Sequence, residues 1–498
     1  MIAVSSGSNL GSGAITLNKN GLLQITKGIS LNQAISLNGG GIDTEGNDIT
    51  LSGALSGAGE LLKSGAGILT ITGRQNYTGG ININQGVVAI DGYTASQNNL
   101  TVSIQPGPSG QFIASELKVN GIANLTGGTL TVTVTPSSSG GLRGVDDIYS
   151  IIKANSISGQ FENVKMGGAY GHYLLLTPTY SGATVELQLG ASAGAYNSGQ
   201  FYAASFYAQN QALSTILAAP GSVSPASTTA NGYWLQGLGN FGHARSITYN
   251  NKGFAIGRGF ALTPNLVVGG AISNVYTNTN GVNGSSVSGV NFGAELNSIY
   301  TLPRWRISTS VGVGHLGNSA TRELSGIGQG KFATNGMYQG MSMDVQYKGF
   351  AGKYLFVSPY AQASYWHTHM GDGQETGLSG VIPMNMRYGA VSTNLGQVGA
   401  GVTADYNIPT TDGLLMPWVR LGGLATLGNT HNHLAETVGQ DTSSASAQVA
   451  ATGAFTSGVG VQLTGGKTSN WQLGINWNGQ FAKNANAQSF ALQGTYKW

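Results

Sequence analysis

Residues 469–498 read SNWQLGINWNGQFAKNANAQSFALQGTYKW and contain two stretches in which large apolar residues alternate with polar or small ones. In the first stretch, Trp471, Leu473, Ile475 and Trp477 are separated by Gln, Gly and Asn. Successive side chains of a strand point to opposite faces, so this alternation puts the apolar residues on one face. An apolar outer face, a polar inner face and aromatic ends are typical of strands in a transmembrane β-barrel.

The same pattern recurs through residues 231–498. Trp305, Ile307, Val311 and Val313 alternate with Arg306 and with Ser and Gly. A soluble barrel would hold its apolar side chains inside, where so many Arg, Asn and Gln could not also fit. We count twelve runs, an even number as such barrels require, which begin near Gly232, Gly253, Asn265, Gly289, Arg304, Lys331, Tyr354, Tyr388, Leu414, Ala447, Ser469 and Ala487.

The composition argues against a large soluble enzyme. Of 498 residues, 80 are Gly and only 22 are basic and 19 acidic, whereas about a quarter of the residues of a soluble protein are charged. The net charge of +3 is too small to indicate a nucleic-acid partner. No stretch approaches the roughly 18 uninterrupted apolar residues of a spanning helix. The absence of Cys excludes disulfides and thiolate metal sites.

Residues 14–90 contain short β-type runs separated by Gly and Asn, among them AITLNKNGLLQI (14–25), DITLSGALSG (48–57) and GILTITG (67–73). These runs recur without a helical period, as in the stacked turns of a β-solenoid. Each turn of a solenoid buries its inward face only against its neighbours. We therefore expect a parallel β-helix in this part of the chain.

Residues 191–219, ASAGAYNSGQFYAASFYAQNQALSTILAA, break the β pattern. They are rich in Ala, place Phe201, Phe206 and Leu213 at helix-compatible spacings, and end before Pro220-Gly221. A helix of this length would extend about 43 Å, enough to cross a bilayer's hydrocarbon core. Its Asn and Gln residues make lipid an unsuitable surrounding, so we expect the helix to pass through a polar barrel lumen.

The segment from Gly57 to Ile90, GAGELLKSGAGILTITGRQNYTGGININQGVVAI, resembles the passenger-associated repeat of autotransporters, bacterial proteins that carry their own passenger across the outer membrane. Gln75 stands where the family usually has Asn, and Ile81 where it usually has Thr. We expect Tyr77 to stack along the coil and the two glycines after Thr78 to supply a turn with positive φ. The matching positions are Gly57, Gly59, Leu61, Lys63, Gly65, Gly67, Leu69, Gly73, Tyr77, Thr78, Gly79 and Gly80.

The resemblance extends along the chain and implies its organisation. Gly159-x-Phe161 follows an Ile-rich strand, as at the C-terminal end of passengers, and Pro359 and Pro417 lie within strands, as in autotransporter barrels. It implies an all-β fold with a right-handed parallel β-helix segment, one linker α-helix and a 12-stranded antiparallel transmembrane β-barrel. The implied domains are a β-helical passenger fragment (1–123, with the repeat at about 57–90), a passenger stem (124–190), a linker helix through the lumen (191–230) and the barrel (231–498).

The last strand implies partners. Phe490, Leu492, Tyr496 and Trp498 share one face, similar to the terminal signal by which the barrel-assembly machinery recognises its substrates. Trp498 replaces the more common final Phe. By the same resemblance we expect contacts with outer-membrane lipid, lipopolysaccharide and periplasmic chaperones, a monomeric barrel and no nucleic acid. The first residues, MIAVSSGSNLGSG, lack the pattern of a secretory signal, so we expect the C-terminal piece of a longer precursor.

Several motifs that suggest chemistry are weak here. The stretch 190–194, centred on Ser192, matches the nucleophile elbow of hydrolases, but no further helical stretches exist to build that fold, and a joint into the helix explains it better. His367-x-His369 and His431-x-His433, with Asp372 and Glu375 after the first pair, could gather imidazoles, yet two ligands do not make a zinc site. Two stretches match the nucleotide-binding motif G-x-G-x-x-G, but neither precedes a helix. We expect no catalytic, cofactor-binding or metal site and no cofactor.

Two kinds of function remain. The first is an outer-membrane translocator of a Gram-negative bacterium that inserts as a barrel and exports or displays its own passenger, an adhesive one, at the cell surface. Small lumen-facing residues, Gly312, Gly314, Gly422 and Gly474, would then leave room for the helix. The second is a porin-like or structural barrel with an extracellular binding domain at residues 1–190. The repeat favours the first, and a hydrolase passenger would rest on Ser192 alone.

Overall fold

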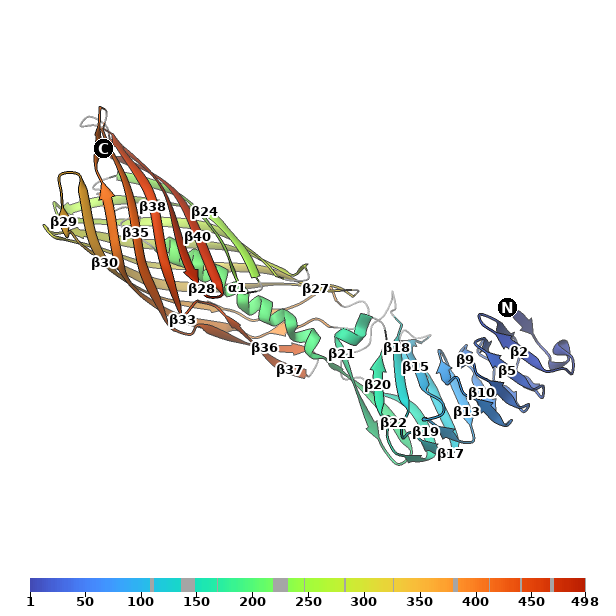
Figure 1. The fold of residues 1–498 in the computed structure, drawn as a ribbon. Coiled ribbons are helices and arrows are strands. Elements are labelled where there is room, and N and C mark those ends of the chain that lie inside the picture. Colours follow the sequence, from blue (N-terminus) through green and yellow to red (C-terminus); the bar gives the residue numbers. More distant parts are fainter. Residues whose placement is uncertain are drawn as a thin grey trace.

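The protein consists of two bodies of β-structure joined by a helix. The computed structural model describes residues 1–107, 112–135, 148–167, 169–217, 232–245, 247–281, 284–325, 327–378, 384–411, 413–438, 441–465 and 470–497. A coil of short strands leads into helix α1 (Ala193–Leu217), which is followed by a barrel (Figure 1). In the part of the chain described, no helix is both long enough and apolar enough to span a membrane.

The coil is a parallel β-helix of three sheets, as expected from the recurring short runs. The first sheet contains β1 (Ile2–Val4), β3 (Leu22–Ile25), β6 (Gly41–Asp43), β9 (Leu61–Ser64), β12 (Ile81–Ile83), β15 (Leu100–Pro106), β18 (Thr129–Val134) and β20 (Asn163–Met166), with β16 (Phe112–Ala114) antiparallel to β15. The second contains β4 (Ser30–Leu31), β7 (Ile49–Leu51), β10 (Ile68–Ile71), β13 (Val87–Ile90), β17 (Glu116–Asn124), β19 (Ile148–Ser158), β22 (Thr184–Ala191) and β21 (Leu174–Tyr180), with β14 (Tyr93–Thr94) beside β17. The third contains β2 (Ile15–Asn18), β5 (Ile35–Asn38), β8 (Leu55–Gly57) and β11 (Gln75–Tyr77). Two short 3₁₀ helices, η1 (Gly7–Leu10) and η2 (Ala169–His172), flank strands of the coil.

The interior of the coil is a ladder of aliphatic side chains. In the second sheet Ile49 pairs with Leu69, Leu69 with Val88, and Val88 with Leu117 on successive turns. All four side chains are buried, and each burial contributes about 1.5–3 kcal/mol relative to exposure. Because the strands are parallel and in register, residues one turn apart in the sequence stack directly on each other.

Glycine allows the turns of the coil to approach closely. A Cβ at Gly73 would overlap the carbonyl oxygen of Gly53 on the preceding turn. Gly80 has a φ of +96°, which side chains disfavour. Gly79 does not have the expected positive φ. Glycine is needed at this position because a Cβ there would overlap the backbone of Gly59 on the preceding turn.

Antiparallel strands close the coil at its C-terminal end. β19 runs parallel to β17 but antiparallel to β22, which is antiparallel to β21. Phe161 of the Gly159-x-Phe161 motif is buried and donates its backbone N–H to the hydroxyl of Tyr180 on β21 at 3.3 Å. Covering the last parallel turn in this way protects a sheet edge that would otherwise pair with other chains.

The C-terminal body is a closed barrel of twelve antiparallel strands, closed by the pairing of β28 with β30. Two short strands, β29 (Phe350–Ala351) and β34 (Ile408–Thr410), extend its hairpins. The fold class expected from the sequence is therefore confirmed. The strands are β23 (Gly232–Ala244), β24 (Ile247–Thr263), β25 (Leu266–Asn280), β26 (Ser286–Thr301), β27 (Trp305–Leu324), β28 (Gly328–Tyr347), β30 (Leu355–Met370), β33 (Val391–Tyr406), β35 (Gly413–Gly428), β38 (Gly453–Gly465), β39 (Trp471–Ala482) and β40 (Ala485–Lys497).

The two ends of the barrel differ. The coil-side end, where α1 enters from the coil, carries the connections that include 371–390 and 429–452, and the far end carries those that include 264–265 and 302–304 (Figure 1). A small sheet at the coil-side end comprises β31 (Gly373–Gln374), β32 (Arg387–Tyr388), β36 (His431–Val438) and β37 (Asp441–Gln448). The runs predicted to begin barrel strands near Tyr388 and Ala447 are wrong in their starts. Tyr388 belongs to β32 of the small sheet, and β33 begins three residues later at Val391. Ala447 belongs to β37, whose alternation is that of the small sheet, and β38 begins six residues later at Gly453.

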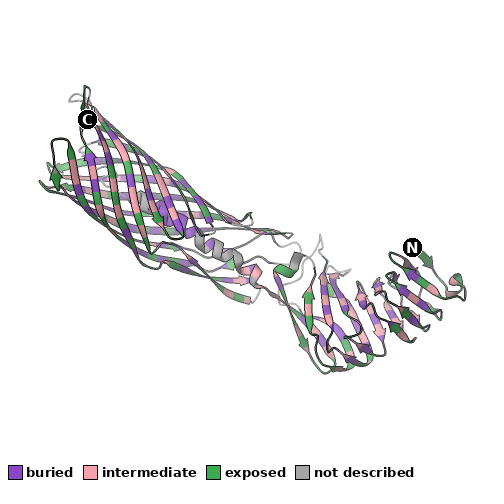
Figure 2. Ribbon diagram, viewed as in Figure 1, coloured by how far each residue is buried: buried purple, intermediate pink, exposed green. Residues whose placement is uncertain are grey.

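Burial alternates along the barrel strands, as Figure 2 shows. In β27 the outward Trp305, Val311 and Val313 are 45%, 57% and 53% exposed, whereas the inward Arg306 and Ser310 are buried. The wall therefore has an apolar outer face and a polar lumen, which is the pattern of a barrel surrounded by lipid.

Candidate functional site

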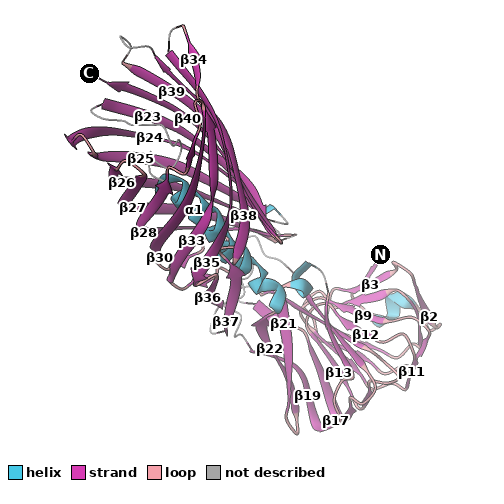
Figure 3. Cartoon of the chain, turned by 60° about the vertical axis from the view of Figure 1, so that its left-hand side comes forward, coloured by secondary structure: helices cyan, strands magenta, loops and turns pink. Residues whose placement is uncertain are grey.

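The barrel lumen contains α1, which runs along its interior (Figure 3). The helix contacts β23 to β28 of the barrel wall and also β36 and β37 of the small sheet. Tyr202, Phe206 and Leu213 of the helix are buried there. Helix and wall thus form one packed unit with the lumen as its core.

Polar side chains join α1 to the wall. Gln209 donates from Nε2 to Oδ1 of Asn318 on β27 at 2.6 Å. Asn210 accepts from the indole N–H of Trp366 on β30 at 3.2 Å and donates to the carbonyl oxygen of Val449 at 3.0 Å. Since lipid could not supply these partners, the Asn and Gln content of the helix is explained by its position in the lumen.

An aromatic cluster supports the coil-side half of α1. The ring of Tyr202 lies 5.0 Å from that of Phe332 on β28 and 5.5 Å from those of Phe206 and Tyr388. The Tyr202 hydroxyl also shares a hydrogen bond of 2.8 Å with Thr334. These contacts fix the rotation of the helix inside the barrel, because they bring together rings from α1, the wall and β32.

The expectation that lumen glycines leave room for the helix needs a correction. A Cβ at Gly314 would overlap the ring of Tyr338, and one at Gly422 would overlap the hydroxyl of Tyr360. These two glycines therefore make space for tyrosines of the wall itself. Gly474 is inward and open, with only the carbonyl oxygen of Val461 near the Cβ position, at 3.8 Å.

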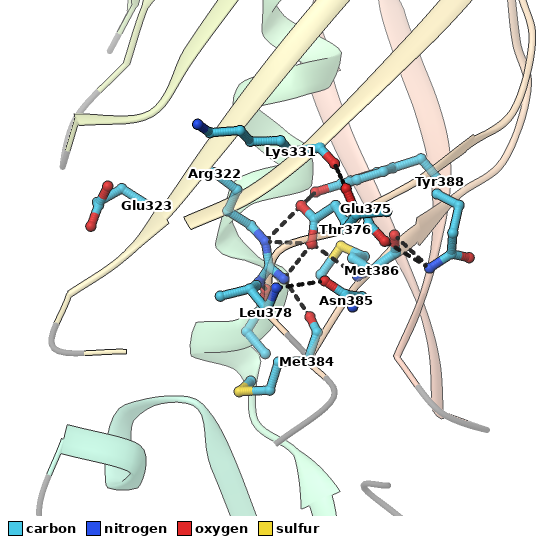
Figure 4. Close-up of polar contacts among 12 residues, drawn as sticks. Arg322, Glu323, Lys331, Glu375, Thr376, Leu378, Met384, Asn385, Met386 and Tyr388 are labelled. Carbon is cyan, nitrogen blue, oxygen red and sulfur yellow. Dashed lines mark hydrogen bonds and ion pairs between the residues drawn. The ribbon is translucent and has the colours of Figure 1, made fainter. Parts of the chain in front are cut away.

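A buried ion pair lies at the coil-side end of the lumen (Figure 4). Arg322 of β27 binds Glu375 through both Nε and Nη2, the shortest contact being 2.6 Å from Nη2 to Oε2. Arg322 also donates to the carbonyl oxygens of Ala195 in α1 and Met384. One guanidinium thereby connects the wall, the connection 371–390 and the first turn of the helix.

Two further groups hold Glu375 besides Arg322. Its carboxylate accepts the backbone N–H of Met386 at 2.9 Å and the hydroxyl of Tyr388 at 2.9 Å, in addition to Arg322. The nearby histidines, whose motif is too weak to predict a metal site, have other partners. His367 faces Asn394 and His369 faces Ser392, each at 2.8 Å, and no group of three metal-ligating side chains occurs in the described parts of the chain.

Glu436 of β36 adds a second buried carboxyl to this end. It is fully buried, and neither of its oxygens has a hydrogen-bond partner. Burial, with a smaller effect of the Glu375 charge, raises the pKa of Glu436 from 4.5 to about 8 despite the opposing influence of Arg322. The carboxyl is therefore largely protonated at neutral pH.

The joint between coil and barrel is closed by Asp441 at the tip of the β36–β37 hairpin. Its carboxylate accepts the backbone N–H of Ala191, the last residue of β22, at 2.9 Å. Its carbonyl oxygen accepts the hydroxyl of Tyr196 in α1 at 3.1 Å. A loop of the barrel thus binds the end of the coil and the start of the helix together.

Ser192 is the N-terminal cap of α1. Its Oγ accepts the backbone N–H of Gly194 at 3.2 Å and donates to the carbonyl oxygen of His172 at 2.7 Å. Side-chain capping of this kind satisfies a free N–H of the first turn. The interpretation of Ser192 as a joint residue agrees with these contacts, whereas a nucleophile would need a base beside it.

A second charged group lies in the far half of the lumen. Arg420 of β35 contacts Asp344 of β28 at 2.7 Å and Gln362 at 3.0 Å, and its guanidinium lies 3.5 Å from the ring centroid of Tyr360. Alternation along a strand can indicate only which face of the wall a side chain occupies. It could not reveal these pairs, which join strands far apart in the sequence.

The passenger-type repeat lies in the coil, away from the barrel. Leu61, Leu69 and Tyr77 are buried in its core, and the Tyr77 hydroxyl has no hydrogen-bond partner. Lys63 is also fully buried, with its ammonium group donating to Thr44 Oγ1 and to the carbonyl oxygens of Ser64, Gly65 and Gln85. Burial lowers the pKa of Lys63 from 10.5 to about 8, opposed by Asp43 and Asp48. The repeat lysine therefore ties together consecutive turns.

The residues of the expected assembly signal lie on the last strand. Phe490, Leu492 and Tyr496 of β40 all face outward and are 45%, 62% and 51% exposed. Tyr496 pairs with Tyr233 on one side and with Trp471 on the other. Trp498 lies outside the described residues. An aromatic row therefore crosses the seam at the far end, as at a membrane interface.

Comparison with known families agrees with the geometry of both bodies. The profile of the autotransporter β-domain matches residues 233–478. The profile of the passenger-associated transport repeat matches residues 61–90. No curated protein sequence matches the chain.

Solved structures with a similar arrangement include three from autotransporters. The translocator domain of NalP from Neisseria meningitidis is 11% identical, with 60% of this chain and 98% of that chain covered and a TM-score of 0.45. The β-domain of the Bordetella autotransporter BrkA is 16% identical over 54% and 100%, with a TM-score of 0.42. The transport unit of AIDA-I from Escherichia coli is 14% identical over 59% and 99%, with a TM-score of 0.39.

The family matches fall on the two bodies separately. The first covers the barrel strands from β23 into β39, and the second covers the part of the coil that contains Lys63 and Tyr77. A barrel of this family inserts in the outer membrane and serves the export of the segment that precedes it. The chain is therefore an autotransporter, with an outer-membrane translocator barrel joined through its lumen helix to the end of a β-helical passenger.

Proposed function

We propose that the coil stands outside the cell and that α1 is the last part of the passenger to have entered the barrel. The observation that carries this proposal is the continuous path from β22 through Ser192 and α1 into the lumen. A folded coil at one end of the pore and a helix held by Arg322 and Trp366 inside it fit the state after export. In this state the helix closes the pore.

The loops support an outward position of the coil. Outer-membrane barrels have short periplasmic turns and longer extracellular loops. The connections 371–390 and 429–452 lie at the coil-side end, and the tight turns 264–265 and 302–304 lie at the far end. We assign the coil-side end to the cell exterior for this reason.

We further propose that the barrel is monomeric and is inserted by the barrel-assembly machinery after escort by periplasmic chaperones, in contact with phospholipid and lipopolysaccharide. A ring closed within one chain needs no second copy to complete it. The outward Phe490, Leu492 and Tyr496 supply an exposed aromatic face on the last strand.

For the passenger we propose a binding, adhesive role without enzymatic activity. Its outer surface carries stacked uncharged polar rows, such as Thr50 paired with Thr70 and Ser36 with Ser56. Such rows suit contact with a partner along the length of the coil. The nucleophile-like Ser192 is engaged in capping α1.

A porin-like barrel is the competing function, and the two differ in the state of the lumen. We expect the full chain in planar bilayers to be closed, and a variant lacking residues 193–217 to conduct ions. On intact cells expressing the chain with an added signal peptide, external protease should remove the coil and leave the barrel. Equal conductance of both proteins would support the porin. A coil resistant until the cells are lysed would contradict the outward orientation.

A further inference from the structure

A shallow groove crosses the outer wall where the first and last barrel strands meet. Its volume is ≈ 600 Å³, within the range of small-molecule sites. Gly237 and Gly239 of β23 form its floor, where a Cβ would meet only a backbone oxygen, at 3.9 and 4.0 Å. The outward neighbours along β23 are Leu235 and Phe241, both exposed. The two glycines thus interrupt a continuous row of large apolar side chains.

The groove has apolar side walls. Phe254 and Tyr276 line one side, and Phe490 and Leu492 line the other. Phe490 is fixed by a stacked contact with Phe241, with 5.9 Å between the ring centroids. Since this face of the barrel borders the membrane, the groove is suited to an extended acyl chain.

One charged residue lies at the edge of the groove. Lys252 of β24 is exposed, pairs with Gly239 across one strand boundary and with Tyr276 across the other, and holds its ammonium group 5.8 Å from the Tyr276 ring. None of the ion pairs among the described residues includes Lys252. A lysine on a lipid-facing wall is costly unless its amine reaches the interface or a counter-charge.

We propose that this groove is a binding site for an anionic, phosphate-bearing lipid. Its acyl chain lies over Gly237 and Gly239 between the aromatic walls, and its phosphate pairs with Lys252. A phosphate supplies the negative charge that the protein does not place beside this ammonium group. Lys252 lies in the coil-side part of β24, so the lipid belongs to the leaflet on the coil side. This proposal holds whichever side of the membrane the coil-side end faces.

Native mass spectrometry of the full chain in detergent tests the proposal with dioleoyl phosphatidylglycerol, and with dioleoyl phosphatidylcholine as the lipid without net charge. We expect retention of phosphatidylglycerol over phosphatidylcholine. Lys252→Gln should weaken that retention about tenfold or more, and Gly239→Leu should abolish it by filling the groove. Two variants serve as controls: Lys331→Gln removes another exposed lysine, and Gly423→Leu fills another outward glycine with open space around it.

The outcomes separate the two parts of the site. Lost retention in Lys252→Gln and Gly239→Leu, with unchanged retention in both controls, supports the groove. Equal retention of the two lipids by the unaltered chain would overturn the requirement for a net negative charge on the lipid. Unchanged retention in Gly239→Leu, with the heat-dependent gel shift of a folded barrel, would overturn the groove itself.

Discussion

Arg322 connects parts of the protein that share no hydrogen-bonded strand pairing. Its guanidinium reaches Glu375 in the connection 371–390 and the carbonyl oxygen of Ala195 in α1. A buried pair of this kind adds little net stability compared with apolar residues, but the loss of one partner is severe, since the other charge stays buried. Because Arg322 contacts both, the position of α1 depends on the contact between Arg322 and Glu375.

We expect Arg322→Met to destabilise the coil-side end by about 3–5 kcal/mol, because Glu375 loses its counter-charge. Hydrogen exchange of residues 371–378 and 193–202 in detergent would measure the effect. The matched control is Arg387→Met, which removes an exposed pair with Asp372 of 3.7 Å and should change exchange little, by about 0–1 kcal/mol. Equal protection in both variants would show that the buried pair does not hold the helix.

Glu436 makes the same region sensitive to pH. Its pKa is raised to about 8 in the folded protein, compared with 4.5 ordinarily, so the folded state binds the proton more tightly than the unfolded state. Stability is therefore greatest below about pH 4.5, falls as the pH rises towards 8, and levels off above that value.

Glu436→Gln should remove this dependence, since an amide does not titrate. Hydrogen exchange of β36 and β37 between pH 5 and pH 9, corrected for the intrinsic exchange rate, compares the variant with the unaltered chain. We expect the local opening free energy to fall with pH only in the unaltered chain. Glu323→Gln, which changes a carboxyl in an exposed hydrogen bond to Gln329, should retain the fall. A parallel fall in Glu436→Gln would contradict the assignment.

At the scale of elements, alternation predicted ten of the twelve barrel-strand starts to within three residues, and it missed the starts of β24 and β38 by six residues each. β23 begins at the predicted Gly232, and β27 begins at Trp305, one residue from the predicted start. The error near Ala447 arose because β37 alternates like a barrel strand, although its partner is β36 in the small sheet. Periodicity indicates which residues share a face, but it does not indicate which strand lies beside them.

The site was predictable only in part for the same reason. The helical pattern and the polar residues of 191–219 predicted a helix in the lumen, and the repeat predicted a buried coil face. Arg322 and Glu375 are 53 residues apart in the sequence, and Trp366 and Asn210 are 156 apart. Such pairs follow from barrel closure and from the fold of the connection 371–390, which no local pattern encodes.

The last strand offers a prediction about insertion. Tyr496→Asp should sharply reduce the amount of barrel in the outer membrane, because it places a charge in the outward aromatic row of β40. Tyr406→Asp is the matched control, since Tyr406 is a similarly exposed tyrosine at the far end of β33. Quantitative blotting of membrane fractions would compare them. Equal loss in both would indicate a general cost of charge at the interface and no special role for the last strand.

At the scale of the whole molecule, ring closure dominates stability. Every barrel strand has two hydrogen-bonded neighbours, so the wall has no free edge at which unfolding could begin. We expect both the full chain and residues 231–498, refolded in detergent, to migrate differently in SDS gels before and after boiling. A variant lacking residues 485–498 should show no such shift, because the ring cannot close without β40. Identical migration of the unaltered chain under both conditions would argue against a closed barrel.

The register of the coil has a mechanical consequence. Its turns are joined by hydrogen bonds between one rung and the next, so tension along the coil axis acts on one rung at a time, while tension on the barrel acts on long strands together. We expect tension along the coil axis to detach its rungs one after another, and the antiparallel strands β19, β21 and β22 beside the barrel to detach last. We therefore expect the coil to lengthen in steps under load while the barrel stays folded.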